Sequence, residues 1–358
     1  MLSLEGITDS IHNWLNHALN PTLAMLSEFV MVGLCVITLF AMLGLVLIMM
    51  ERKVSAYMQV RIGPNRVGPG GMFQTLADTL KLVVKEGLTP DGADHFLFNL
   101  APFVVLSASM LALAPVAFAK GFQVWDLPIG ILYVSAISSV SVIGILMAGW
   151  ASNNKYSLLG AMRSGAQIVS YELSAGLSVL TIVILTGSLR ISDIIQAQQD
   201  GWWIFKGHIP AIIAFVIFLI AVTAETNRAP FDMAEAESEL TAGFHTEYSG
   251  MKFALFFLAE YVNIFIVCAI GAALFFGGWM PFHIGHWESF NHIMDFIPSS
   301  IWFTGKTFAL IFVIMWFRWT FPRLRIDQLL NLEWKYLLPI SMANLLLTTF
   351  VAIKGWYF

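Results

Sequence analysis

The sequence predicts an all-α, polytopic integral membrane protein with eight transmembrane helices and a cytoplasmic amphipathic surface helix. Of its 358 residues, 58% are hydrophobic and only 12% are charged, and the mean hydropathy is +0.76. Soluble domains carry about 25% charged residues, so this chain cannot build an ordinary water-facing surface. Eight apolar stretches approach the roughly 20 residues that a spanning helix needs. We therefore expect lipid to be the solvent.

The apolar stretches follow one another without an internal repeat or a low-complexity linker, so we expect a single membrane domain over residues 1–358. The predicted spans are residues 29–50, 96–119, 129–151, 164–187, 209–225, 251–277, 306–321 and 334–353. The fifth and seventh spans are the shortest, and their ends are the least sharply defined.

Basic residues predict the orientation of the spans. The connections that follow odd-numbered spans carry 14 of the 19 Lys and Arg residues. Because positive charge gathers in cytoplasmic loops, we place these connections in the cytoplasm and both termini in the periplasm of a bacterial inner membrane. A mitochondrial inner membrane is the less favoured alternative. No Lys or Arg precedes Arg52, so the first span lacks the basic region of a secretory signal and is expected to be retained.

Composition and motifs exclude several functions. The net charge of −4 is too small to suggest nucleic-acid binding. Cys35 and Cys268 alone cannot build an iron–sulfur cluster or a Cys-rich zinc site. His283 and His286 have helical spacing, but neighbouring Pro and Gly residues disfavour a helical metal site, so we expect no metal. The dinucleotide motif G-x-G-x-x-G is absent, and this chain is not expected to bind NADH itself.

An amphipathic helix is predicted over residues 73–86 in the first cytoplasmic loop. Its apolar stripe consists of Phe73, Leu76, Ala77, Leu80, Val83 and Val84. The helix is too short to span a membrane but suits its surface. In the simpler interpretation its charges are merely solvated. In the alternative, the stripe and the first span form the walls of a lipid-accessible slot, with Asp78 and Lys81 near the head of an amphiphilic ligand.

Two carboxylates lie where hydrocarbon should exclude them. Glu172 and Glu260 are each about 12–14 Å deep when counted from the predicted starts of the fourth and sixth spans. A charge at that depth is costly, so such residues face protein or water and are candidates for proton transfer. The structural alternative is a neutral acid bound to Tyr171, Tyr261 or a backbone carbonyl. Whether the two acids face each other stays open.

An acidic cytoplasmic loop is predicted over residues 226–250, directly after the fifth span. If residues 232–240 are helical, three of the acids share one face and Glu237 points away. The simpler alternative is a solvated acidic surface. Together with the buried acids, however, the loop forms a ladder from the surface to the middle of the membrane, as a proton path requires. The acids of this ladder are Glu225, Asp232, Glu235, Glu237, Glu239 and Glu247.

These segments resemble one membrane subunit of respiratory complex I, a family that includes the H subunit of bacterial proton-translocating NADH:quinone oxidoreductase and mitochondrial subunit 1. The resemblance is carried by residues 71–81 (GMFQTLADTLK) and 224–239 (AETNRAPFDMAEAESE). Shorter matches are residues 51–53 (ERK), 170–173 (SYEL), 259–261 (AEY) and 316–325 (WFRWTFPRLR). The likeness runs from the first span to the eighth, but not over the residues before Glu28 or over 278–305.

The resemblance implies a quinone path and a proton-coupling path. Matching positions put Arg52, Arg61, Asp78, Arg228 and Arg318 around the quinone, whereas Arg318 by itself could equally anchor lipid headgroups. The coupling path would contain Glu172, Glu225, Asp232, Glu235, Glu237, Glu239, Glu247 and Glu260. Quinone, either ubiquinone or menaquinone, would be the substrate. The flavin, the iron–sulfur clusters and the NADH site would lie on partner subunits, including one hydrophilic subunit that bears the terminal cluster.

Two alternatives accompany this hypothesis. The anchor subunit of a membrane-bound hydrogenase resembles the same family, but the surface helix and the complete acidic loop favour the quinone enzyme. A stand-alone secondary transporter could use Glu172 and Glu260 as ion sites. Transporters often break helices near such sites, and no Gly or Pro interruption lies beside either acid.

Overall fold

The computed structural model describes residues 10, 12–15, 17, 20–199, 201–234, 237–283 and 287–356. Within these residues, eight helices are long and apolar enough to cross a membrane, which confirms the predicted fold class. They are α2 (Pro21–Met58), α4 (His95–Ala112), α5 (Gly130–Ala151), α6 (Lys155–Thr186), α9 (His208–Glu225), α11 (Gly250–Phe275), α13 (Ser299–Thr320) and the segment Ile326–Lys354. In the last segment, α14 (Ile326–Leu332) passes through a π-helical turn (Glu333–Leu337) into α15 (Leu338–Lys354).

Shorter elements connect the spans. They are the 3₁₀ turns η1 (Pro69–Gly71) and η2 (Gly243–His245), the helices α3 (Gln74–Val84), α7 (Ile191–Gln196), α8 (Trp203–Lys206), α10 (Glu237–Leu240) and α12 (Glu288–Asp295), and the strands β1 (Ala117–Ala119) and β2 (Phe122–Gln123). The predicted surface helix therefore exists as α3, somewhat shorter than the predicted 73–86.

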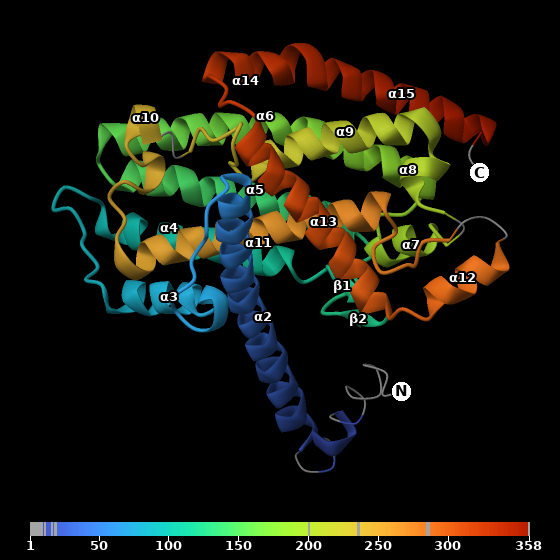
Figure 1. Cartoon of the computed structure of the whole chain (residues 1–358), viewed down its shortest axis with the longest axis horizontal. Coiled ribbons are helices and arrows are strands. Elements are labelled where there is room, and N and C mark those ends of the chain that lie inside the picture. Colours follow the sequence, from blue (N-terminus) through green and yellow to red (C-terminus); the bar gives the residue numbers. More distant parts are fainter. Residues whose placement is uncertain are drawn as a thin grey trace.

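The first spanning helix is longer than predicted. With 38 residues, α2 is roughly 57 Å long, well beyond the ~30 Å hydrocarbon thickness of a bilayer. It crosses the other helices steeply, and its first half projects from the body of the protein (Figure 1). Side chains of this projecting half, including Cys35, are exposed. A helix of this length accommodates a bilayer by tilting.

Other boundaries also differ from the prediction: α6 and α13 begin before the predicted residues 164 and 306, at Lys155 and Ser299. Two further differences have local chemical reasons. The second span was predicted to reach residue 119, but α4 ends at Ala112 because Pro115 cannot continue a helix, and β1 then pairs with β2 in an antiparallel hairpin. The eighth span was predicted to begin at residue 334, but its helix begins at Ile326, where Gln328 Oε1 accepts from the backbone N–H of Arg325. Glu333 therefore lies inside the helical segment.

Small residues allow the central helices to pack closely. On α5, Gly144 faces Val105 of α4, and Gly149 faces Ala161 of α6. Such close approaches are the usual means by which helices associate in membranes. In this way α6 is enclosed by α5, α9 and α15, while α11 packs against α4, α13 and α2.

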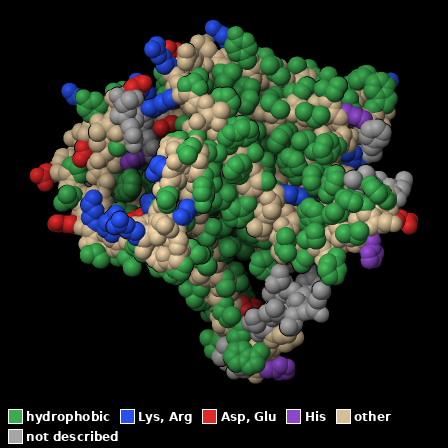
Figure 2. Space-filling model, in the orientation of Figure 1, with side chains coloured by type: hydrophobic (Ala, Val, Ile, Leu, Met, Phe, Trp, Pro, Cys, Tyr) green, Lys and Arg blue, Asp and Glu red, His purple; other side chains and the backbone are tan. Residues whose placement is uncertain are grey.

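Charged side chains concentrate at one end of the helix bundle. Figure 2 shows Lys, Arg, Asp and Glu gathered where α3, α10 and α14 lie, next to a broad apolar surface. We call this the charged end. Here η2 lies directly on α6, because a Cβ added to Gly160 would be 2.8 Å from Gly243 Cα. Only glycine permits this approach.

Candidate functional site

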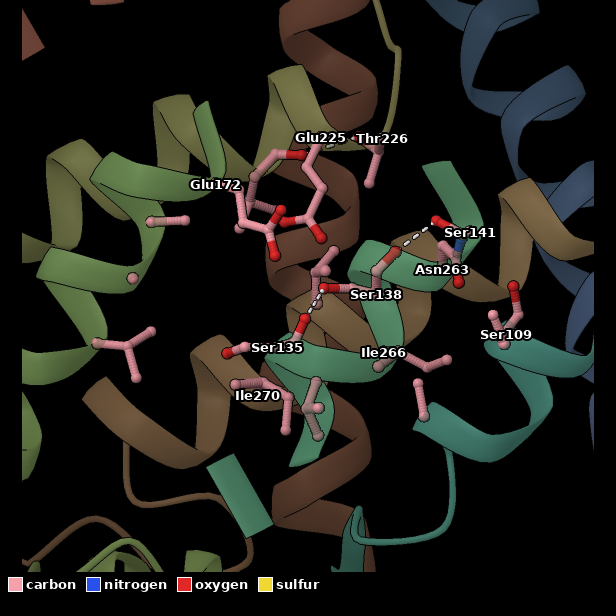
Figure 3. A pocket seen from close by; sticks show the side chains of 18 of the residues that line it. Ser109, Ser135, Ser138, Ser141, Glu172, Glu225, Thr226, Asn263, Ile266 and Ile270 are labelled. Carbon is pink, nitrogen blue, oxygen red and sulfur yellow. Dashed lines mark hydrogen bonds between the residues drawn. The ribbon is translucent and has the colours of Figure 1, made fainter. Parts of the chain in front are cut away.

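Two partly buried acids share a polar cavity between α5, α6, α9 and α11. Figure 3 shows the carboxyl groups of Glu172, from α6, and Glu225, from the end of α9, turned toward each other. The cavity has a volume of about 110 Å³, enough for several water molecules. Its polar lining also includes Ser135, Ser138, Ser141, Thr226 and Asn263. A further serine of α5, Ser139, donates a hydrogen bond to Oε1 of Glu172.

A second cavity, of about 40 Å³, continues from the first toward Glu260. Four residues line both cavities: Ser141, Glu225, Thr226 and Asn263. Glu172 lines only the first cavity and Glu260 only the second. Glu172 and Glu260 therefore line different cavities, and Glu225 lines both of them.

A cluster of buried charges adjoins the second cavity at the charged end. Arg228 lies 3.0 Å from Oε1 of Glu51 and 3.1 Å from Oε1 of Glu260, and its guanidinium stacks over the ring of Tyr261 at 4.4 Å. Arg318 of α13 donates to the same oxygen of Glu51. Burial alone would lower the pKa of Arg228, but the charges of Glu260 and Glu51 raise it well above its ordinary value. The cation is thus held by two acids from different helices.

The surface helix is tied to α2 by an ion pair. Arg52 Nη1 lies 2.5 Å from Oδ2 of Asp78, and Lys81 Nζ lies 3.5 Å from Oδ1. Burial acts to raise the pKa of Asp78, but the hydrogen bond and the charge of Arg52 outweigh it and leave the pKa below its ordinary value. Arg61 is exposed and binds its neighbour Gln59 instead, with Nε 2.6 Å from Oε1.

The apolar stripe of α3 faces away from the protein. Exposed side chains of the stripe are Phe73, Leu76, Leu80, Val83 and Val84. Among the described residues, nothing covers most of this face. An uncovered apolar stripe suits both an interfacial helix and the wall of a lipid-accessible slot, and the Arg52–Asp78 pair ties α3 to α2 in either case.

The acidic loop does not form the predicted helix over residues 232–240. Asp232 lies outside any helix, and α10 comprises only Glu237–Leu240, so the expected shared face of Asp232, Glu235 and Glu239 is wrong for Asp232. A cis Ala229–Pro230 peptide bond precedes this region, and Met233 and Ala234 form a turn. Glu235 and the side chain of Glu237 lie outside the described residues.

Two loop acids are instead held by the first part of α6. Arg163 Nη1 lies 2.6 Å from Oε2 of Glu239, and this hydrogen bond lowers the pKa of Glu239. Asn154 Nδ2 lies 2.5 Å from Oε1 of Glu247. The backbone carbonyl of Asp232 accepts from Arg323. These contacts attach the loop to the charged end.

Sequence reasoning missed three parts of the site. Glu51 stood out only as part of a motif, although an acid at the end of a span beside two bases is a signal for a buried ion pair. The serines of α5 recur at positions 135, 138 and 141, a spacing that places them on one helical face. Glu333 was placed just outside the eighth span, but it is buried and its Oε1 accepts from Ser174 of α6.

The outer histidines show no metal geometry in the described residues. His283 Nε2 lies 3.0 Å from Asp295 Oδ1, and His286 lies outside the described residues. Within the part of the chain that the structure describes, no three His, Cys, Asp or Glu residues come close enough to hold a metal ion.

The fold and this geometry define a polytopic α-helical membrane protein in which a row of partly buried acids ends at a pair of arginines. Residues 30–349 match the family model described as NADH dehydrogenase, and the chain belongs to that family. It is 55% identical to the H subunit of NADH-quinone oxidoreductase from Bacteroides fragilis and to that from Bacteroides thetaiotaomicron, over 100% of each chain. The H subunit from Bacillus cytotoxicus is 49% identical over 97% of this chain and 98% of its own.

Proposed function

We propose that this chain is the quinone-site membrane subunit of a proton-pumping NADH:quinone oxidoreductase. Its relatives carry the name of the H subunit of NADH-quinone oxidoreductase and match it over nearly their full length. In this proposal the chain supplies the entrance for the quinone and the start of the proton-coupling path. NADH, flavin and iron–sulfur chemistry belongs to partner subunits, and the chain itself holds no covalent or metal cofactor.

The quinone path is proposed at the charged end, where α2, α3 and α13 meet. A quinone would enter from the bilayer between α2 and α3, near the Arg52–Asp78 pair, and move toward Arg228 and Arg318. Electrons would come from the hydrophilic subunit that bears the terminal iron–sulfur cluster. Lys81 and Arg61, both exposed, would lie at the outer edge of this path.

The observation that carries the proposal is the shared position of Glu225. It lines both cavities, together with Glu172 in one and with Glu260 in the other, and Glu260 binds Arg228. Quinone reduction consumes two protons, and a charge change beside Arg228 would act on Glu260 through a short, poorly screened distance. Carboxyl groups separated by a few waters can pass protons between them.

The loop acids are proposed as the water-facing part of the same path. Glu239 and Glu247 are fixed to α6, the helix that also carries Glu172. Asp232, Glu235 and Glu237 belong to the same proposed path by their position in the loop. The charged end would then face the cytoplasm of a bacterium, and both termini the periplasm.

The two alternatives predict different partners. A hydrogenase anchor would use the same acids but would have no quinone between α2 and α3, and a stand-alone transporter would migrate without a redox assembly. A photo-crosslinking quinone analogue mapped by mass spectrometry separates them. Labels on α2, α3 or α11 support the quinone path, and labels confined to other helices contradict it.

The proton path is tested by changing Glu225 to Gln in the assembled enzyme, in sealed inverted membrane vesicles. We expect proton pumping to be lost and NADH:quinone reductase activity to fall, because the amide cannot release a proton. Glu288→Gln is the matched control, since Glu288 is an exposed acid of α12. Full activity and full pumping in Glu225→Gln would refute the path.

A further inference from the structure

Gln167 holds the two ends of the turn that follows α9. It lies on α6 with a side chain that is only 1% exposed. Its Nε2 donates to the backbone carbonyl of Ala224 at 2.6 Å and to that of Phe231 at 2.7 Å. These two carbonyls bracket the segment that contains Glu225 and Arg228. One amide group therefore fixes where this segment begins and ends.

The middle of the turn is bound to the same place on α6. Oδ1 of Asn227 lies 3.3 Å from both Gln167 Nε2 and Ser164 Oγ. Asn227 has a left-handed backbone conformation, with φ of +50°, which a short polar side chain tolerates better than most. The turn is thus held at its two ends by Gln167 and at its middle by Ser164, with Gln167 Nε2 also near Asn227 Oδ1.

The same helix carries the acid that faces Glu225. Glu172 follows Gln167 by five residues, which is a rise of about 7.5 Å along α6. Gln167 consequently sets how the end of α9 lies against α6, and with it the position of Glu225 relative to Glu172. It also anchors the backbone beside Arg228, which binds Glu51 and Glu260.

We propose that Gln167 is a positioning residue for proton transfer between Glu172 and Glu225, and for the placement of Arg228. The inference rests on the proposed function of the acid row. Proton transfer requires groups within hydrogen-bond reach, directly or through one water. A displacement of about 1 Å can cost roughly 100-fold in rate, so a clamp this close to the acids governs their efficiency.

The clamp uses the donor half of the amide. Both hydrogens of Nε2 are directed at carbonyl acceptors, while Oε1 is buried without a hydrogen-bond partner. Replacement by Met keeps the length of the side chain and removes both donors. Replacement by Glu keeps the shape but provides one O–H donor only when the new carboxyl group is protonated. The two variants separate hydrogen bonding from packing.

Gln198 offers a matched control. Its side chain is also 1% exposed, and its Nε2 donates to the carbonyls of Ala273 at 2.8 Å and Ile194 at 3.2 Å. It follows α7, away from the two cavities and the charged end. Gln198→Met therefore removes a comparable buried clamp from a place where no acid depends on it.

The experiment measures NADH:quinone reductase rate and protons pumped per NADH in sealed inverted vesicles, per assembled complex, across a pH series. We expect Gln167→Met to lower the pumping rate by at least about tenfold. The pumping rate of Gln167→Glu, relative to that of the wild type, should rise as the pH falls, since protonation of the new carboxyl group restores one donor. Gln198→Met should keep the wild-type number of protons pumped per NADH and the wild-type pH profile, even if less complex assembles.

Wild-type pumping in Gln167→Met overturns the inference. If that variant does not assemble, Gln167→Glu decides, and a pH profile parallel to wild type overturns the inference equally. The Glu225→Gln enzyme tells the two proposals apart. If it pumps normally, the proposed function fails. If it does not pump while Gln167→Met does, only the role of Gln167 fails.

Discussion

Arg228 Nη1 lies 3.0 Å from Oε1 of Glu51, although 177 positions separate the two residues in the chain. The contact joins the turn after α9 to α2 inside the protein, where both residues are only 6% exposed. The residue after Glu51 is Arg52, which binds Asp78 of α3. Adjacent residues of α2 therefore connect the surface helix with the row of partly buried acids.

Glu51→Gln should destabilise the protein strongly. Arg228 and Arg318 would lose the charge that they share, and removing one partner from a buried ion pair typically costs about 3–5 kcal/mol. Asp126→Asn is the control, because the Arg190–Asp126 pair at 3.4 Å is exposed and should contribute at most about 1 kcal/mol. Thermal unfolding of the purified complex measures both variants. Equal unfolding temperatures would contradict the prediction.

The attachment of α3 should depend on pH in acid. Because the pKa of Asp78 is lowered in the folded state, its ion pair stabilises the fold above the unfolded pKa of about 3.9. This contribution is lost as the pH falls through the lower, folded pKa. In the Asp78→Asn variant, the backbone amide hydrogens of α3 should therefore exchange with solvent faster than in the wild type at neutral pH. Below about pH 4 the difference should shrink, after correction for intrinsic exchange rates. A difference that grows in acid would refute the assignment.

The hydrogen bond between Ser174 and Glu333 should contribute more to the stability of the fold than the negative charge of Glu333 does. Ser174→Ala leaves a buried carboxyl group without its donor, and we expect a loss of about 1–3 kcal/mol in unfolding free energy. Glu333→Gln retains an oxygen that can accept from Ser174 and should cost less. Denaturation of the two variants under identical conditions gives the comparison. The reverse order would show that the carboxyl group contributes in another way.

Gly160→Ala should loosen the acidic loop. The added Cβ would lie 2.8 Å from Gly243 Cα and from the backbone nitrogen of Phe244, neither of which can move without shifting η2. Overpacking of this kind typically costs about 1–3 kcal/mol, so we expect a loss of that size. Gly33→Ala is the control, because nothing lies within 4 Å of the added atom. Faster proteolysis in residues 226–250 for the first variant alone is the expected result.

The sequence was sufficient to predict the helices but not all of their ends. Eight apolar stretches became eight spans, because hydropathy reports directly on the solvent around a helix. It reports less on where a helix stops outside the membrane. The helix α2 therefore extends beyond its predicted range at both ends, and the helix of the eighth span begins earlier than predicted, at Ile326. The strand β1 lies at the end of the apolar stretch that was predicted as the second span, and β2 lies just beyond it.

Residue types at the site were predictable, whereas their partners were not. Glu172, Glu225 and Glu260 stood out because acids are costly in hydrocarbon. Their order depends on how α6, α9 and α11 are rotated about their axes, and a depth count along each helix does not contain that information. Glu51 and the α5 serines were overlooked because each is inconspicuous until a partner from another helix is known.

The projecting half of α2 has a practical consequence. Of the two free cysteines, Cys35 lies exposed on that half and Cys268 is buried in α11. A membrane-permeant thiol reagent should thus attach a single fluorophore to the unmodified protein, at the helix that borders the proposed quinone entrance. Quenching of that fluorophore by lipids brominated at different acyl carbons would report how deep, and at what tilt, this helix sits in a bilayer.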